Sequence, residues 1–228
     1  MAKVSLSDHM QERRPEPERD PEKCGPFVTI SREYGCWGFS LGLLLLEILN
    51  EEAEPGEDSW QVYHKEILER LATEANVGLE IIEQQRREKP RMLIDFFRSF
   101  KKDRVPSGYE IRNRTITIIR GLATAGHSLI IGQGGAGATH DLPNGISIRL
   151  EAPEDWRVKQ IAFREGLSET EARLRLRAQE QERDYLKRTY ESKFPRKPAF
   201  NLTYDCSEFT LAQIAQHVVY AMKLKGIA

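Results

Sequence analysis

The stretch that decides the fold is FVTISREYGCWGFSLG, residues 27–42. Residues 27–30 form a short apolar run that favours a β-strand, a turn containing glycine follows, and the apolar residues 41–49 suit a buried helix. A strand, a glycine turn and a helix in this order have the outline of a phosphate-binding loop. Such a loop normally carries a lysine that neutralises phosphate. This chain has no lysine between Lys23 and Lys65.

The composition predicts one folded domain of a soluble protein. The chain has 228 residues, of which 39% are hydrophobic and 30% charged, so it can bury one substantial core. Its formal charge of -1 gives no general attraction to nucleic acid or to an anionic membrane, so an anion site has to be local. The longest apolar run, residues 41–49, is too short to span a bilayer.

The cysteines and the N-terminus indicate the cell compartment. There are three cysteines, without the spacing of a zinc site or of a disulfide framework. We therefore expect reduced thiols in a cytoplasmic protein. Residues 1–25 are rich in Pro, Glu and Arg without apolar periodicity, and they are predicted to be a disordered leader before a single domain over residues 26–228.

Short apolar segments recur along the chain between helical segments. Further strands are predicted at 60–63, 128–131, 146–150 and within 200–207, and helical patterns lie between them and after the last one. Ser168 and Glu171 form a capping box that opens a long charged helix. Five strands with helical crossovers predict a three-layer α/β fold with a parallel sheet covered on both faces. A ligand is then expected beyond the carboxyl ends of the strands, where SREYGCWG, GQGGAG and EAPEDWR meet.

Six motifs, in this order, carry a family resemblance: TISREYG, YHKEIL, LIIGQGG, RLEAPEDWRVKQI, GLSETEARLRLRAQEQER and FNLTYD. From residue 27 to the C-terminus, the chain resembles the cytidylate kinase-like family, a bacterial branch of the P-loop nucleoside monophosphate kinases. The resemblance implies a P-loop kinase fold with a five-stranded parallel sheet. It also implies a helical insert for binding a nucleoside monophosphate (NMP) at about 63–110 and a helical lid at about 166–193.

The resemblance further implies a reaction and its partners. ATP would donate its γ-phosphoryl group to CMP, dCMP or a related nucleotide, and Mg²⁺ would bridge the phosphates. Such transfer depends on positioning and on neutralising phosphate charge. ATP and a nucleoside monophosphate are therefore the expected partners, and neither nucleic acid nor a membrane is expected. No oligomeric state is predicted.

The chain departs from the family pattern in the phosphate loop. Aligned with GxxxxGK[ST], the lysine position falls on Gly38 or, shifted by one residue, on Phe39. The family often lacks this lysine too, but it typically shows GSGG followed by a polar residue or arginine. Here Cys36, Trp37 and Phe39 stand instead, and the bulk of Trp37 would obstruct close approach of phosphate to the backbone. Other departures are His64 for an acid, Gln133 for arginine, Asn201 for aspartate and Glu180 for a lid aspartate, whereas Arg183 is retained.

Arginines are the candidates for the missing charge, because their fork of donors matches phosphate. The predicted catalytic residues are Arg32, Arg183 and Arg157. The predicted phosphate-binding residues are Ser31, Arg32, Gly35, Gly38 and Ser40, with Ser40 also the candidate Mg²⁺ ligand. The predicted NMP-binding residues are His64, Arg112, Gln133 and Gly134, and the predicted lid residues are Arg173, Arg177, Glu180 and Arg183.

Structural alternatives remain open for several of these residues. Arg32 could form a salt bridge with Glu33, the lid arginines could line a solvated helix face, and Ser40 could cap its helix. At the level of function, the alternative to a kinase is a catalytically impaired nucleotide sensor or interaction module of the same fold. Nucleic-acid binding through residues 173–188 is disfavoured, because acidic residues interleave the basic ones.

Overall fold

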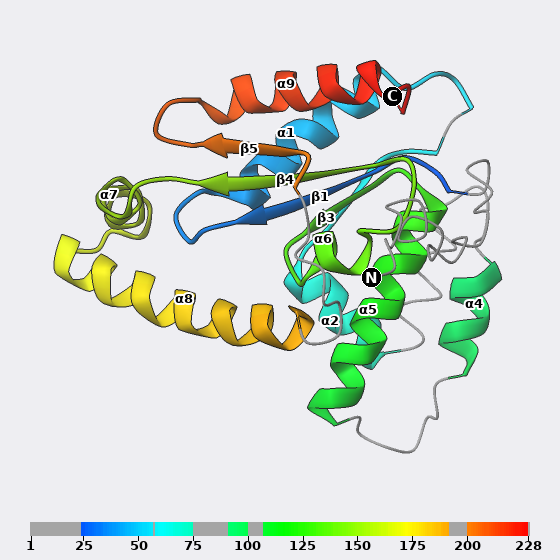
Figure 1. The fold of residues 1–228 in the computed structure, drawn as a ribbon, viewed down its shortest axis with the longest axis horizontal. Helices are drawn as coiled ribbons and strands as arrows, with labels where there is room; N and C mark the ends of the chain where they lie inside the picture. The colour runs from blue at the N-terminus through cyan, green and yellow to red at the C-terminus, as the bar shows by residue number, and fades with distance from the viewer. Residues whose placement is uncertain (1–23, 57, 75–90, 100–106, 192–199, 228) are drawn as a thin grey trace, which may run out of the picture.

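The computed structural model describes residues 24–56, 58–74, 91–99, 107–191 and 200–227. Its centre is one parallel sheet with the strand order β2-β3-β1-β4-β5 (Figure 1). The strands are β1 (Phe27–Arg32), β2 (Gln61–Tyr63), β3 (Ser128–Ile131), β4 (Gly145–Glu151) and β5 (Leu202–Asp205). The predicted five-stranded parallel sheet is confirmed.

Helices cover both faces of the sheet, as expected for an all-parallel arrangement. The helices of the described residues are α1 (Gly38–Glu51), α2 (Lys65–Thr73), α4 (Arg91–Arg98), α5 (Gly108–Ala125), α6 (Gly135–Ala138), α7 (Glu154–Glu165), α8 (Glu169–Glu191) and α9 (Leu211–Leu224). Helices α1 and α9 pack together on one face, whereas α2, α5 and α6 lie on the other (Figure 1). The α/β fold predicted from the sequence therefore has its three layers.

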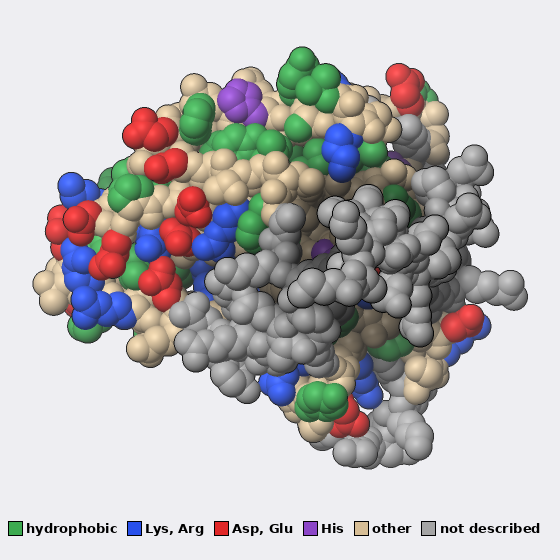
Figure 2. Space-filling model, viewed as in Figure 1, with side chains coloured by type: hydrophobic (Ala, Val, Ile, Leu, Met, Phe, Trp, Pro, Cys, Tyr) green, Lys and Arg blue, Asp and Glu red, His purple; other side chains and the backbone are tan. Residues whose placement is uncertain are grey.

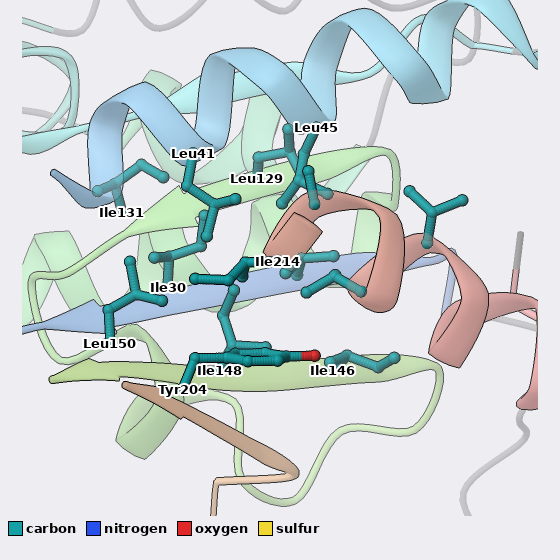
Figure 3. Packing of buried hydrophobic residues seen from close by; sticks show 14 of the residues in the cluster. Ile30, Leu41, Leu45, Leu129, Ile131, Ile146, Ile148, Leu150, Tyr204 and Ile214 are labelled. Carbon is teal, nitrogen blue, oxygen red and sulfur yellow. The ribbon is translucent and has the colours of Figure 1, made fainter. Parts of the chain in front are cut away.

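Alternation along the central strands divides the core in two. Val28 and Ile30 of β1 belong to the cluster beneath α1 and α9, whereas Phe27 belongs to the cluster beneath α2 and α5. Figure 3 shows the first cluster, in which Leu41 and Leu45 of α1 meet the sheet. Both leucines are fully buried, and burial of such a side chain contributes about 1.5–3 kcal/mol. This packing fixes α1 on the sheet and so fixes the loop that precedes it.

Helices α7 and α8 form a hairpin at the carboxyl ends of the strands (Figure 1). A small separate cluster, made of Val158, Ile161, Ala172 and Leu176, holds the two helices together. The predicted capping box opens α8: the Glu171 N–H donates to Ser168 Oγ at 3.3 Å, and the Ser168 N–H donates to Glu171 Oε2 at 2.9 Å. Tyr34 packs against this cluster, so the hairpin lies beside the loop after β1.

Some predicted regions lie outside the described residues. They are nearly all of the leader, about half of the insert and the end of the lid, at 1–23, 75–90, 100–106 and 192–199. Among the helices that the structure describes, none is long and apolar enough to cross a membrane. Over α7 and α8, acidic and basic side chains are mixed on the face shown in Figure 2, as the interleaved sequence of α8 predicts.

Candidate functional site

The loops that follow β1, β3 and β4 meet at the carboxyl ends of the strands, as predicted. The loop after β1 is short, because α1 already begins at Gly38 rather than at Leu41. Its Glu33 N–H donates to the Leu150 carbonyl oxygen at 2.9 Å, which ties it to β4. Gly35 has a φ of +94°, and a Cβ there would lie 3.0 Å from the Cβ of Arg157. The loop is therefore pressed against the start of α7, and only glycine fits this position.

Arg32, the last residue of β1, places its guanidinium against the turn after β3. A Cβ on Gly132 would lie 1.8 Å from Arg32 Nη1, and Gly132 has a φ of +70°. Burial, and secondly the charge of Arg183, lowers the pKa of Arg32 to about 10, with a smaller opposing effect of Glu66. No carboxylate forms an ion pair with Arg32 within the described residues. No described carboxylate thus neutralises the partly desolvated Arg32, and a salt bridge from Arg32 to Glu33 is not formed.

Arg183 reaches the same place from α8. Its Nη1 donates to the main-chain carbonyl oxygen of Arg32 at 3.2 Å, and its guanidinium carbon lies 5.2 Å from the centre of the Tyr34 ring. Burial lowers the pKa of Arg183 as well. Two partly desolvated guanidinium groups are therefore held near each other. Like charges in this arrangement make the binding of an anion favourable, because the anion offsets both their repulsion and their desolvation.

Glu33 forms ion pairs with two other arginines near the loop after β1. Arg149 Nη2 donates to Glu33 Oε1 at 3.4 Å, and Arg157 Nε lies 3.3 Å from Glu33 Oε2. The Ala152 N–H also donates to Glu33 Oε2 at 3.3 Å. Glu33 therefore joins β1, β4 and the start of α7, and this role explains why it is not available to Arg32.

Arg157, a predicted catalytic residue, is buried, and both its Nε and its Nη1 are hydrogen-bonded. Its Nε donates to the Ala152 carbonyl oxygen at 2.9 Å, and its Nη1 donates to the Tyr34 carbonyl oxygen at 3.3 Å. The same Nη1 is hydrogen-bonded to Glu180 of α8. Arg157 thus holds the loop and the α7–α8 hairpin together. Ser31, a predicted phosphate ligand, accepts from Arg149 Nη1 at 3.1 Å.

Trp37 of the loop and Phe39 of the first turn of α1 have contacts with different elements. Trp37 has a left-handed backbone (φ 46°, ψ 43°), which costs a residue with a side chain roughly 1–2 kcal/mol. The Arg164 guanidinium of α7 stacks 4.1 Å from the centre of its ring. Phe39 is 44% exposed and packs edge-on against the ring of His64, with the ring centroids 5.0 Å apart. Neither contact involves Arg32 or Arg183.

Ser40, the candidate Mg²⁺ ligand, lies in the first turn of α1. Its Oγ accepts from Arg164 Nη1 at 3.3 Å. The residue at the N-cap position is Trp37, and no side chain caps the helix there. The alternative that Ser40 caps α1 is therefore wrong, and the amide groups at the start of α1 remain available to an anion.

The predicted NMP-binding residues come from three neighbouring elements. His64 precedes α2, and its Nδ1 is hydrogen-bonded to Glu66. Gln133 and Gly134 follow Gly132 in the turn after β3 and have left-handed φ angles of 51° and 72°. Arg112 lies on α5, and its buried Nε has no hydrogen-bond partner among the described residues. His64 therefore lies at the carboxyl end of β2, and Gln133 and Gly134 lie at that of β3, which is the neighbour of the strand that carries Arg32.

The predicted lid residues divide in the structure. Arg173 donates to Glu154 at 2.6 Å and to Asp155 at 2.8 Å, which joins α8 to α7. Arg177 is exposed, and Glu180 bonds Arg157. Of the three predicted lid arginines, Arg183 alone has a described contact with the loop after β1. Sequence reasoning missed Arg149 and Arg164, although a charged residue near the end of the strand RLE was a signal for Arg149.

Comparisons with known proteins place this geometry in context. The model of the cytidylate kinase-like family matches residues 27–208. A solved structure of an uncharacterized protein from Eubacterium ventriosum ATCC 27560 is 19% identical, with a TM-score of 0.61, and the match covers 87% of this chain and 98% of that one. At this identity, the likeness shows the fold alone. A shikimate kinase from Acinetobacter baumannii in complex with shikimate is 14% identical, with a TM-score of 0.47 over 92% of this chain and 100% of that one. No curated protein matches the chain.

Proposed function

The chain belongs to the cytidylate kinase-like family, and we propose that it is a phosphotransferase that moves the γ-phosphoryl group of ATP to CMP, dCMP or a related nucleoside monophosphate. Family membership supports the reaction class. The arginines at the carboxyl ends of the strands support a way to perform it without the usual lysine. The base and the sugar of the acceptor are left to experiment.

The observation that carries the proposal is the contact between Arg183 and Arg32. Both guanidinium groups are partly desolvated, the charge of Arg183 lowers the pKa of Arg32, and neither forms an ion pair with a carboxylate in the described part of the chain. A protein keeps two such charges together at a cost in stability. Such a pair suits phosphoryl transfer, because negative charge spreads over the phosphoryl oxygens in the transition state and two nearby guanidinium groups stabilise that charge.

The proposal gives each residue of the cluster a role. Arg32 would replace the missing lysine at the terminal phosphates of ATP, while the amide groups of Gly35 and Gly38 would face the phosphate chain. Arg183, which comes from the lid, would contact the phosphoryl group in transfer. Arg157 and Glu33 would act as positioning residues, because their charges already satisfy each other. His64, Gln133, Gly134 and Arg112 would form the acceptor side.

The described side chains would supply only few ligands for Mg²⁺ at this site. Within the described residues there is no group of three or more His, Cys, Asp or Glu side chains that could hold a metal by itself. Mg²⁺ at nucleotides is held mainly by phosphates and water, with one or two protein oxygens. Ser40 Oγ, in the first turn of α1, would be such an oxygen once it exchanges its hydrogen bond from Arg164. The bound ion would neutralise phosphate charge.

Two residues favour a second function, which is a nucleotide sensor with impaired catalysis. Phe39 stands at one of the two possible lysine positions, and Trp37 keeps a backbone conformation that suits glycine. A site with these residues could bind ATP through Arg32 and still transfer phosphate slowly. The two functions therefore differ in turnover rather than in binding.

A coupled assay of ADP release, with Mg-ATP and a panel of monophosphates, tests the proposal. We expect turnover with a cytidine monophosphate in the range of ~1–100 per second that is common for kinases. ADP release without acceptor is the control for ATP hydrolysis. Binding of Mg-ATP in calorimetry without turnover on any acceptor would favour the sensor. No binding at ~1 mM nucleotide, where the binding free energy is only about -4 kcal/mol, would refute both functions.

A further inference from the structure

An arginine of α7 lies against the loop after β1. The guanidinium carbon of Arg164 lies 4.1 Å from the centre of the Trp37 ring, and its Nη1 donates to Ser40 Oγ at 3.3 Å. Trp37 directly precedes α1 and Ser40 lies in its first turn, so both contacts bring a positive charge to the start of that helix. The lysine of a phosphate-binding loop lies in this part of the motif. The residues that stand there in this chain, Gly38 and Phe39, carry no charge.

The charge of Arg164 is not neutralised by a carboxylate of the described residues. The acid next to it in sequence is engaged elsewhere, because Glu165 accepts from the Tyr34 hydroxyl at 2.6 Å and pairs with Arg175 Nε at 3.3 Å. Within the described part of the chain, Arg164 forms no ion pair, and its Nε and Nη2 have no hydrogen-bond partner. The side chain is also exposed. Its planar fork therefore keeps donors for an oxyanion.

Trp37 is held at a cost to the fold. Its φ of 46° lies in the left-handed region, and its buried Nε1 has no hydrogen-bond partner among the described residues. Both features are unfavourable, and a glycine at this position would avoid them. Of the described contacts of Trp37, the stack with Arg164 is one that only an aromatic ring provides, and indole is the best ring for it.

Arg32 approaches the same helix start from the central strand. A Cβ on Gly38 would lie 3.1 Å from both Cγ and Cδ of Arg32, so the stem of Arg32 passes directly beside the first residue of α1. Arg164 approaches from α7 through Trp37 and Ser40. The two arginines therefore reach the start of α1 from different elements, and an anion bound there would have a cation from each within reach.

We propose that Arg164 is a phosphate-contacting residue of the nucleotide site and that the ring of Trp37 is its platform. This role rests on the proposed function, because its ligand is the phosphate chain of the same nucleotide. On binding, Arg164 Nη1 exchanges Ser40 Oγ for a phosphate oxygen, which releases the Ser40 hydroxyl from its present bond. Arg164 thereby supplies part of the positive charge that a lysine supplies in other phosphate-binding loops, and Trp37 is a positioning residue.

Calorimetry of the full-length protein with Mg-ATP and with inorganic tripolyphosphate tests the role of Arg164. We expect Arg164→Ala to weaken the binding of both ligands by ~10–100-fold, because a hydrogen bond to a charged group is lost. Lys159→Ala removes another exposed cation of α7 and should change neither affinity by more than ~2-fold. Equal affinities of wild type and Arg164→Ala would overturn the proposal. A loss with Mg-ATP alone would equally overturn it, because it would assign Arg164 to the base or the sugar.

A double-mutant cycle tests the role of Trp37. Trp37→Asn removes the ring and introduces a residue that tolerates the left-handed backbone, whereas Trp37→Phe keeps a ring. We expect Trp37→Asn to weaken binding ~2–5-fold and Trp37→Phe to restore most of this loss. In the Arg164→Ala background, Trp37→Asn should have no further effect. Losses that multiply in the double variant would overturn the role of Trp37 as the platform of Arg164.

The same measurements separate the role of Arg164 from the proposed function. If wild type binds tripolyphosphate but not Mg-ATP, the proposed function fails, while the comparison with Arg164→Ala still decides whether Arg164 contacts phosphate. If Arg164→Ala binds Mg-ATP as well as wild type does, the role of Arg164 fails alone. If wild type binds neither ligand, both fail.

Discussion

Arg183 donates a hydrogen bond from its Nη1 to the main-chain carbonyl oxygen of Arg32, at a distance of 3.2 Å and across 151 residues of sequence. The bond joins α8 to the end of the central strand. It also brings a second positive charge to a place where the first is already desolvated. The predictions below follow from this pair and from the turn that accommodates it.

Replacing Arg183 should impair transfer more than binding. We expect Arg183→Ala to lower turnover by ~10³-fold or more, as loss of an arginine finger does, with a smaller loss of ATP affinity. The coupled assay gives turnover and calorimetry gives affinity. Lys159→Ala removes an exposed cation of α7 and is the control for net charge. Unchanged turnover in Arg183→Ala would exclude it from the reaction.

Replacing Arg32 should weaken the binding of Mg-ATP without lowering the stability of the fold. Arg32→Met removes a partly buried charge that has no carboxylate partner among the described residues, so the free energy of unfolding should stay equal or rise by ~1 kcal/mol. Affinity for Mg-ATP should fall at the same time. Urea unfolding and calorimetry on the same preparation provide both values. A large loss of stability would mean that Arg32 serves the fold rather than a ligand.

The lowered pKa of Arg32 predicts how stability changes at high pH. Its pKa is about 10 in the folded protein, below the ordinary value of 12.5, because burial disfavours its charge. Between these two pH values, the unfolded chain binds more protons than the folded protein, so the free energy of unfolding rises with pH. The destabilising effect of the desolvated Arg32 charge is thereby relieved. The comparison is between wild type and Arg32→Met at pH 9 and 11. The advantage of the variant should shrink at the higher pH, and a constant difference would contradict the shift.

Gly132 should be required for the position of Arg32. Gly132→Ala puts a Cβ 1.8 Å from Arg32 Nη1 at a φ of +70°, so the guanidinium has to move and the backbone is strained. We expect a loss of ~1–2 kcal/mol in stability and weaker binding of Mg-ATP. Gly137→Ala is the matched control, because no atom lies within 4 Å of its Cβ and the residue is helical. The control should be neutral or slightly stabilising.

Phe39→Lys tests whether the loop lacks only a charge. Phe39 is 44% exposed, so the substitution should cost little stability. A new charge-assisted bond to phosphate is worth about 1.5–3 kcal/mol, and we expect turnover or ATP affinity to rise ~10-fold or more. Phe39→Gln removes the ring without adding charge and is the control. An equal gain in both variants would identify the ring, rather than the missing cation, as the obstacle.

The fold was predictable because the apolar runs are separated by helical crossovers, which leave few arrangements other than a parallel sheet. The capping box at Ser168 was also readable, because its pattern is local. The start of α1 was not, since the apolar period begins at Leu41 whereas the backbone turns helical at Gly38. Local sequence patterns thus predicted the presence of a helix or strand better than the residues at which it begins and ends.

The site was predictable only in its parts. Arg32 and Arg183 were candidates by their positions in motifs, but their contact depends on how a distant helix packs. Glu33 was the expected partner of Arg32, and the structure gives it to Arg149 and Arg157, because β4 and α7 lie on that side of the loop.

The small cluster between α7 and α8 has a consequence for the position of the Arg183 charge. Among the described residues, the buried apolar side chains there are Val158, Ile161, Ala172 and Leu176, and such a small unit opens locally at a lower free energy than the central sheet. Opening of this hairpin would move Arg183 away from Arg32, because Arg183 lies on α8 and Arg32 ends β1. In the proposed function, a nucleotide that contacts both arginines would therefore also hold the α7–α8 hairpin against the end of β1.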